Sequence, residues 1–145
     1  MTQIFEHQTD VGWFDLDANR HMKNTAYMEK AVDCRLRFFN ANDFPFEELA
    51  RLKVAFVVVS DATTYARELF LGDKIRVQIL CGGENAKGTR FEIVNRIIAA
   101  DGAMVYEIRS MLVWLDTDTR KSCKPPPQLA ALIAKLARTE NYRAL

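Results

Sequence analysis

Side chains that can move protons or accept hydrogen bonds are concentrated in the short segment from Trp13 to Asn24. They are those of Asp15, Asp17, Asn19, His21 and Asn24. The segment lies between an expected strand and an expected helix, and a helix N-terminus presents unpaired N–H groups and a positive dipole end. A carboxylate beside such donors can act as nucleophile or base on a carbonyl group that they polarise. In the simpler interpretation, Asp15 and Asp17 only shape the loop and Asn24 only caps the helix.

The whole pattern of this segment favours the chemical interpretation. It resembles the hotdog-fold thioesterases in the order Asp17-x-Asn19-x-His21-x-x-Asn24, followed by Tyr27 and an amphipathic helix. In acyl-CoA thioesterases like 4-hydroxybenzoyl-CoA thioesterase, the strand ends in Asp-x-Asp, and the second Asp, the catalytic one, matches Asp17. In plant acyl-carrier-protein thioesterases the motif is Asp-x-Asn-x-His-Val-Asn-Asn. It matches the same four positions here, with Met22-Lys23 in place of Val-Asn.

The resemblance implies hydrolysis of the thioester of an acyl-CoA, or of an acyl-carrier protein, to a free acid and a thiol. Asp17 would be the nucleophile or the general base that activates water, and both roles stay open. Asn19 would orient Asp17 or the water, and His21 would either carry a proton or fix the loop. Backbone N–H groups at 22–24 would stabilise the oxyanion. This chemistry needs no metal and no cofactor, and none is expected.

Further substrate contacts are implied on later strands and loops. The resemblance places Ser60, Asp61 and Thr63 of a partner subunit along the acyl cleft. Lys87 and Arg90 flank a flexible Gly-containing loop and would meet the nucleotide phosphates as a point charge and a planar fork. In the simpler interpretation these are polar strand residues and solvated charges. The expected partners are an acyl-CoA substrate and further copies of the chain, in a homodimer or homotetramer with sites at the subunit interface.

Hydrophobic periodicity predicts the elements that must position these residues. It indicates strands at 4–13, 54–65, 74–82, 89–99 and 103–115, a long helix at 25–39, a short helical turn at 44–51 and a C-terminal helix from 125 to about 137. One long helix among antiparallel strands needs a curved sheet to pack around it. The expected class is therefore α+β. The resemblance implies the hotdog fold, with a curved antiparallel sheet of about five strands around one central helix.

Local patterns refine this expectation. The β-branched run from Val54 to Val59 is typical of a central strand, and Asp101-Gly102 indicates a tight hairpin. Cys34 falls on the apolar face of the long helix and is expected in the core. Several aromatic side chains would either line a pocket or belong to the core: Phe14, Tyr27, Phe38, Phe56 and Tyr65.

Length and composition limit the partners and the cellular compartment to be expected for this chain. With 145 residues and a net charge of +1, the chain is expected to be one domain, 1–145, with neither nucleic acid nor an anionic membrane as partner. The longest purely apolar run is too short to span a bilayer, and the first ten residues carry charges where a signal peptide would be apolar. Three cysteines without a Cys-x-x-Cys pair fit a reducing cytoplasm and no structural zinc site.

Two other functions are alternatives to thioester hydrolysis. A hotdog hydratase or dehydratase would carry Asp-x-Asn-Pro-x-His, whereas here Arg20 replaces the Pro and His21 comes one position too early. A non-catalytic acyl-CoA-binding hotdog protein is the other alternative. The presence of Asp17 beside a helix start argues against it.

Overall fold

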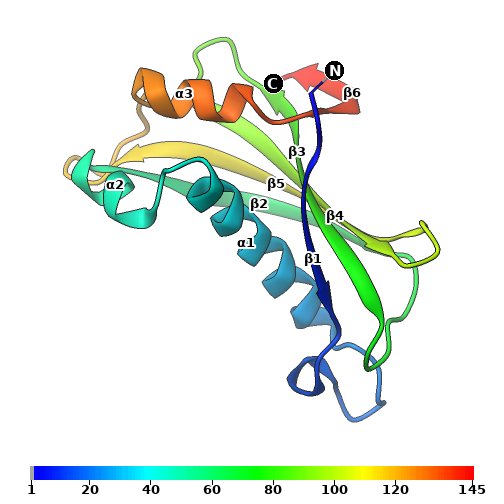
Figure 1. The fold of residues 1–145 in the computed structure, drawn as a ribbon. Coiled ribbons are helices and arrows are strands. Elements are labelled where there is room, and N and C mark those ends of the chain that lie inside the picture. Colours follow the sequence, from blue (N-terminus) through cyan, green and yellow to red (C-terminus); the bar gives the residue numbers. More distant parts are fainter. Residues whose placement is uncertain (1) are drawn as a thin grey trace.

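The longest helix, α1, lies in the concave side of one curved sheet (Figure 1). The computed structural model describes residues 2–145. Along the chain the elements are β1 (Phe5–Asp10), the short 3-10 helix η1 (Trp13–Asp15), α1 (Asn24–Ala41), α2 (Phe46–Arg51), β2 (Val54–Tyr65), β3 (Lys74–Glu84), β4 (Arg90–Ala99), β5 (Met104–Asp116), α3 (Pro127–Ala134) and β6 (Arg138–Ala144). This arrangement confirms the predicted hotdog fold.

The sheet has six strands, of which five follow the order β1-β3-β4-β5-β2 with antiparallel neighbours. The sixth strand, β6, pairs with β3 in parallel. Sequence analysis missed β6 because its segment is mostly polar and shows no apolar alternation. The hairpin at Asp101-Gly102 is confirmed, with Gly102 at φ 88°, a conformation that favours glycine.

Apolar side chains at helical spacing explain why α1 packs on the sheet. Ala26, Ala31, Cys34 and Phe38 are buried on one side of the helix and belong to the main core cluster. The facing side chains come from alternate positions of the strands, and on β5 they include Ile108, Leu112 and Trp114. The prediction that Cys34 belongs to the core is confirmed.

The prediction of a central strand at Val54–Val59 is wrong for the single subunit. β2 pairs only with β5 and forms an edge of the sheet. Val57, Val58 and Val59 are exposed, although their residue types are those of a buried strand. A hydrophobic run alone does not tell a central strand from an edge strand.

Element ends also differ from the sequence-based expectation. β1 stops at Asp10 and the chain turns into η1, so Trp13 is not part of the strand. α1 starts at Asn24 with Lys23 as its N-cap. β3 continues to Glu84, beyond the predicted loop start, and α3 ends at Ala134. Across residues 2–145, no helix combines the length and the apolar character that crossing a membrane requires.

Candidate active site

The candidate site forms where the loop between β1 and α1 folds back on itself, at the lower end of α1 in Figure 1. Leu16 and Met22 pair in a short antiparallel bridge. Between them a tight turn is closed by a hydrogen bond of 3.1 Å from the Arg20 N–H to the Asp17 carbonyl. Arg20 adopts φ 66°, the left-handed conformation that such a turn needs. Asp17 therefore lies at the start of a rigid turn.

The two oxygens of the Asp17 carboxylate have different surroundings. Oδ1 accepts a hydrogen bond of 2.8 Å from the Asn19 N–H, which fixes the carboxylate in the turn. Oδ2 lies 3.6 Å from Nδ1 of His21. Asn19 thus orients Asp17 through its backbone, and its side chain is exposed. One carboxylate oxygen is structural and the other faces the imidazole.

His21 connects this turn to the segment between β2 and β3. Its Nε2 lies 3.8 Å from Oε1 of Glu68, and its Nδ1 lies 3.3 Å from the Met22 carbonyl. The Met22 N–H donates a 2.7 Å hydrogen bond to the carbonyl of Leu69, which holds the two segments together. Sequence analysis did not identify Glu68, because it lies far from His21 along the chain and only tertiary pairing brings the two together.

Asp17 and His21 line a cavity of about 430 Å³. Its other walls come from Met22, Asn24, Tyr27 and the segment Tyr65–Glu68. Asn24 and Tyr65 also line a second cavity of about 590 Å³ along the outer face of α1, with Met28, Val32 and Leu36. The two cavities therefore adjoin at Asn24 and Tyr65, and together they are called the groove below. Charged side chains enter the groove near Asp17, and apolar side chains of α1 line it along the helix.

Two tyrosines fix the wall between helix and sheet. The Tyr27 hydroxyl donates to the carbonyl of Arg67 at 3.1 Å, and the Tyr65 hydroxyl donates to the carbonyl of Asn24 at 3.2 Å. Their rings meet edge to face at 5.2 Å. Burial raises the pKa of Tyr27, and the negative charge of Glu68 adds to this effect. The Tyr27 phenol is therefore a neutral donor at neutral pH.

The N-terminus of α1 differs from the prediction at two points. Asn24 is the first helical residue, not the N-cap, and no side chain caps the helix. The N–H groups of Met22 and Lys23 donate to the carbonyls of Leu69 and Asp15, at 2.7 and 2.8 Å, so they are not free for an oxyanion. The remaining donors at this end are the first-turn N–H groups of Asn24 and Thr25, which an α-helix leaves without an internal acceptor.

Asp15 shapes the loop, as the simpler interpretation of the sequence expects. Its Oδ2 accepts 2.8 Å from the Gly12 N–H and lies 3.0 Å from Nζ of Lys30 on α1. Burial opposes ionisation of Asp15, but the Gly12 hydrogen bond and Lys30 outweigh it and lower the pKa of the carboxyl. Asp15 therefore ties the loop to the helix as a charged group.

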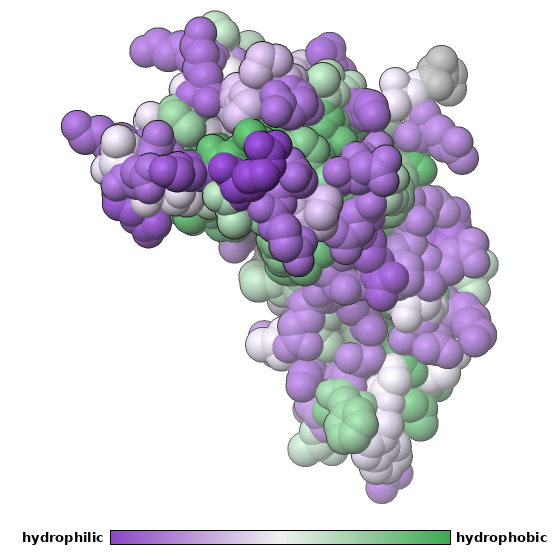
Figure 2. All heavy atoms as spheres, turned by 60° about the vertical axis from the view of Figure 1, so that its left-hand side comes forward, coloured by the Kyte–Doolittle hydropathy of each residue, from purple (hydrophilic) through white to green (hydrophobic). Residues whose placement is uncertain are grey.

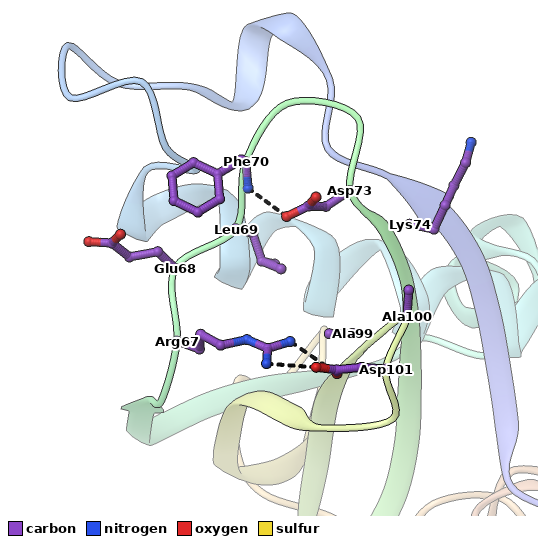
Figure 3. Close-up of a pocket in the computed structure, with 9 residues that line it drawn as sticks. All are labelled: Arg67, Glu68, Leu69, Phe70, Asp73, Lys74, Ala99, Ala100 and Asp101. Carbon is purple, nitrogen blue, oxygen red and sulfur yellow. Dashed lines mark hydrogen bonds and ion pairs between the residues drawn. The ribbon is translucent and has the colours of Figure 1, made fainter.

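The loop after β2 has a separate cavity on its other side, drawn in Figure 3. Arg67 points into it and forms a fork with Asp101, with N–O distances of 2.8 and 3.1 Å. The Arg67 fork and the backbone hydrogen bond from Ala103 lower the pKa of Asp101 to about 2. Figure 3 shows Glu68 leaving the loop on the side opposite to Arg67. The Arg67 clamp thus fixes the loop that presents Glu68 to His21.

Ser60, Asp61 and Thr63 lie on the exposed edge strand β2, outside the cavity that Asp17 lines in this subunit. A β-bulge separates Val58, which pairs with Leu112, from Ser60, which pairs with Met111, and Asp61 then pairs with Ser110. Asp61 accepts a 2.5 Å hydrogen bond from the Ser110 hydroxyl. It has a partner in the core, which its sequence position did not reveal.

The Asp61 carboxylate is connected to a buried arginine of α1. Arg35 is 5% exposed and donates to Ser110 at 2.7 Å and to Asn95 at 2.8 Å. Burial lowers the pKa of Arg35, and the charge of Asp61 opposes this effect. Ser110 accepts from Arg35 and donates to Asp61, so it links the buried cation to the carboxylate at the edge strand.

Lys87 and Arg90 lie together, but at the other end of the subunit from Asp17. They line a pocket of about 160 Å³ with Lys124, beside α3. Arg90 starts β4 and Ala99 ends it, so at about 3.3 Å per residue these ends lie about 30 Å apart. The cavity with Asp17 adjoins the Ala99 end, because Arg67 belongs to its wall and pairs with Asp101. One subunit therefore does not bring Lys87 and Arg90 to its own Asp17.

The remaining aromatic candidates divide into two groups. Tyr27 and Tyr65 line the groove, whereas Phe38 and Phe56 pack in or against the core. Phe14 does neither and is 90% exposed. Figure 2 shows hydrophobic atoms projecting at the lower end of the face it draws, the end where Figure 1 places the loop between β1 and α1. Within residues 2–145, no group of three or more His, Cys, Asp or Glu side chains is arranged to hold a metal ion.

Comparisons with known proteins agree with this architecture. The model of the thioesterase-like superfamily matches residues 11–133. Among solved structures, the chain resembles the protein SAV2348 from Staphylococcus aureus, solved in complex with CoA, with a TM-score of 0.84 and 25% identity over 92% of this chain and 84% of that one. No curated protein sequence matches the chain.

Two further solved structures share the fold at lower identity. One is Slr0204, a 1,4-dihydroxy-2-naphthoyl-CoA thioesterase from Synechocystis, with a TM-score of 0.81 and 14% identity over 91% of this chain and 96% of that one. The other is YbaW, a probable thioesterase from Escherichia coli, with a TM-score of 0.76 and 22% identity over 91% of this chain and 98% of that one.

Proposed function

Because the chain belongs to the thioesterase-like superfamily, we propose that it hydrolyses the thioester of an acyl-CoA to a free acid and CoA thiol, with Asp17 as the catalytic carboxylate. The observation that carries this proposal is the position of Asp17 in the wall of the cavity beside the start of α1. Its Oδ2 is not used by the turn and faces the cavity-lining His21. It is the oxygen that would attack the thioester or deprotonate water.

The helix start would supply the electrophilic part of the site. The N–H groups of Asn24 and Thr25 are the proposed oxyanion donors, helped by the positive end of the α1 dipole. The acyl group would lie along the apolar part of the groove, against Met28, Val32 and Leu36. These side chains are four residues apart on α1, so they form a continuous stripe on one side of the helix.

The rest of the substrate would contact a second subunit. We propose a dimer in which β2 edges pair, since β2 has an unpaired edge and exposed valines. Antiparallel pairing would bring the Tyr65 end of one β2 toward the Val54 end of the other, the end near which Trp114 lines the Lys87–Arg90 pocket. Lys87, Arg90 and Lys124 of the partner would then receive the CoA phosphates.

The test is thiol release across a panel of acyl-CoA and acyl-carrier-protein thioesters, with Asp17→Asn beside the wild type. The substitution keeps the size of the side chain and removes its charge. We expect a loss of about a hundredfold or more in kcat with the fold intact. Asp118→Asn is the matched control, because Asp118 lies in an exposed ion pair with Lys53.

Other outcomes of this experiment would contradict the proposal. Equal activity of the wild type and Asp17→Asn would assign Asp17 to loop structure alone. A wild type that binds acyl-CoA but releases no thiol from any member of the panel would favour a binding protein. Activity only with acyl-carrier protein would replace the proposed substrate and leave the role of Asp17 intact.

A further inference from the structure

A row of hydrogen-bonded side chains crosses the layer between α1 and the sheet. At its centre Arg35 of α1 donates to Asn95 of β4 at 2.8 Å and to Ser110 of β5 at 2.7 Å. Asn95 continues the row by donating to the carbonyl of Gln78 on β3, and Ser110 continues it by donating to Asp61 on β2. The row therefore links the helix to four neighbouring strands and ends at an edge of the sheet.

Arg35 is a buried cation whose direct partners, an amide and a hydroxyl, carry no charge. It is 5% exposed. Burial lowers its pKa, and the acidic groups of Asp61, Tyr106 and Cys34 oppose this effect. Tyr106 and Cys34 are neutral at neutral pH, because burial raises the pKa of both groups, that of Cys34 to about 12. The Asp61 carboxylate is therefore the counter-ion of Arg35, reached through one hydroxyl group.

This counter-ion lies where a second subunit is proposed to bind. Asp61 is exposed, and its strand β2 forms an edge of the sheet. In a single subunit, the water around Asp61 weakens its attraction to Arg35. Pairing of two β2 edges would remove much of this water, and the attraction between opposite charges increases as the effective dielectric constant falls. Assembly would thus strengthen the hold of Asp61 on the helix.

We propose that Asp61 is a positioning residue that acts through assembly: edge pairing buries its carboxylate, which then holds Arg35, and with it α1, firmly on the sheet. The inference rests on the proposed function, in which the β2 edges pair and the start of α1 supplies the oxyanion donors. Arg35 is about 16 Å along the helix from Asn24, at about 1.5 Å per residue. Catalytic groups must be held to within about 0.5 Å, so a helix that shifts on the sheet loses rate.

The test starts from Asp61→Asn, which removes the charge while the amide oxygen can still accept from Ser110. We expect the variant to dimerise about tenfold more weakly in sedimentation experiments. At concentrations where the variant is still a dimer, kcat should fall about tenfold with KM little changed. Asp118→Asn, which removes a carboxylate from an exposed ion pair, is the matched control and should behave as the wild type.

Hydrogen exchange of the α1 amide groups separates this role from simple stabilisation of each subunit. Diluting the wild type from dimer to monomer should speed the exchange, because the helix is then held less firmly. In Asp61→Asn the exchange should already be fast in the dimer and should change little on dilution. A carboxylate that only stabilises the single subunit would speed exchange equally in monomer and dimer when it is removed.

A double variant tests the charge pair itself. Removing one partner of a buried ion pair leaves the other uncompensated, whereas removing both is less costly. Asp61→Asn combined with Arg35→Gln should therefore recover part of the dimer strength that Asp61→Asn loses. If variants of Arg35 fail to fold, the exchange measurement on Asp61→Asn decides alone.

Three outcomes would overturn the inference while the thioesterase stands. They are an Asp61→Asn dimer as tight as the wild type or tighter, helix exchange in the wild type that does not respond to dilution, and an unchanged kcat. A wild type that stays monomeric would overturn the proposed edge pairing first and the role of Asp61 with it. A dimeric wild type that releases no thiol would contradict the proposed reaction, whereas dimer strength and exchange would still report on Asp61.

Discussion

At the scale of the residue, the sequence predicts where chemistry is concentrated but not how the parts of each side chain are used. The spacing of Asp15, Asp17 and His21 predicts a polar loop before a helix, and the structure places all three there. It does not predict that one oxygen of Asp17 is held by the turn. Nor does it reveal Glu68, because contacts between distant loops leave no local pattern. Asn24 was expected to cap α1, but Lys23 takes that position and Asn24 becomes helical.

Asp15 gives a prediction about stability and pH at this scale. Its pKa is lowered in the folded state, so its ion pair with Lys30 stabilises the fold above the unfolded value near 3.8. This contribution is lost as the pH falls through the lower folded pKa. Asp15→Asn should therefore reduce the free energy of unfolding at pH 7 by about 1–3 kcal/mol, a difference that closes in acid. Urea unfolding at a series of pH values measures it.

The control for that measurement is again Asp118→Asn. Its partner Lys53 is 66% exposed, so the pair should contribute less than about 1 kcal/mol. A difference between the wild type and Asp15→Asn that persists in strong acid would show that the carboxylate charge is not its source.

At the scale of the element, hydrophobic periodicity predicts every strand and helix except η1 and β6. Amphipathic and β-branched patterns report which residues prefer burial, and α1 and β3–β5 follow them closely. β2 has such a pattern but lies at an edge of the sheet. β6 lacks the pattern, and hydrogen bonds from polar side chains help to attach it to the sheet. Arg96 and Arg109 reach Glu140 and Asn141 of β6 at 2.9 and 3.0 Å.

The attachment of α1 to the sheet gives a prediction at this scale. Ser110 accepts from the buried Arg35 of α1 and donates to Asp61 of β2. Ser110→Ala would leave the guanidinium short of an acceptor, so the free energy of unfolding should fall by about 1–3 kcal/mol. Chemical unfolding measures this, with the exposed Ser122→Ala as control. An unchanged stability would mean that water replaces the hydroxyl at no cost.

At the scale of the whole molecule, the sequence resemblance predicts the fold, and the structure and the family match confirm it. The arrangement of subunits is not contained in the pattern of one chain. The distance between the Asp17 cavity and the Lys87–Arg90 pocket is the feature that makes assembly relevant to function. If both serve one substrate, they come from different subunits.

The proposed pairing of β2 edges gives a prediction at this scale. Val58 is 46% exposed in the subunit, and Val58→Lys would place a charge in the paired edges. Sedimentation should show the wild type as a dimer or larger and the variant shifted toward monomer. Leu71→Lys, an exposed apolar residue away from β2, should leave the assembly unchanged. A monomeric wild type would contradict the pairing.

The buried cysteines have a consequence for watching the core open. Cys34 of α1 and Cys81 of β3 both belong to the main core cluster, and burial raises the pKa of their thiols to about 12 and about 11. Neither forms the reactive thiolate at neutral pH while the core is closed. A thiol reagent can modify them only when the core around them opens. The rate at which these thiols are labelled therefore measures how often the core opens locally, without an added probe.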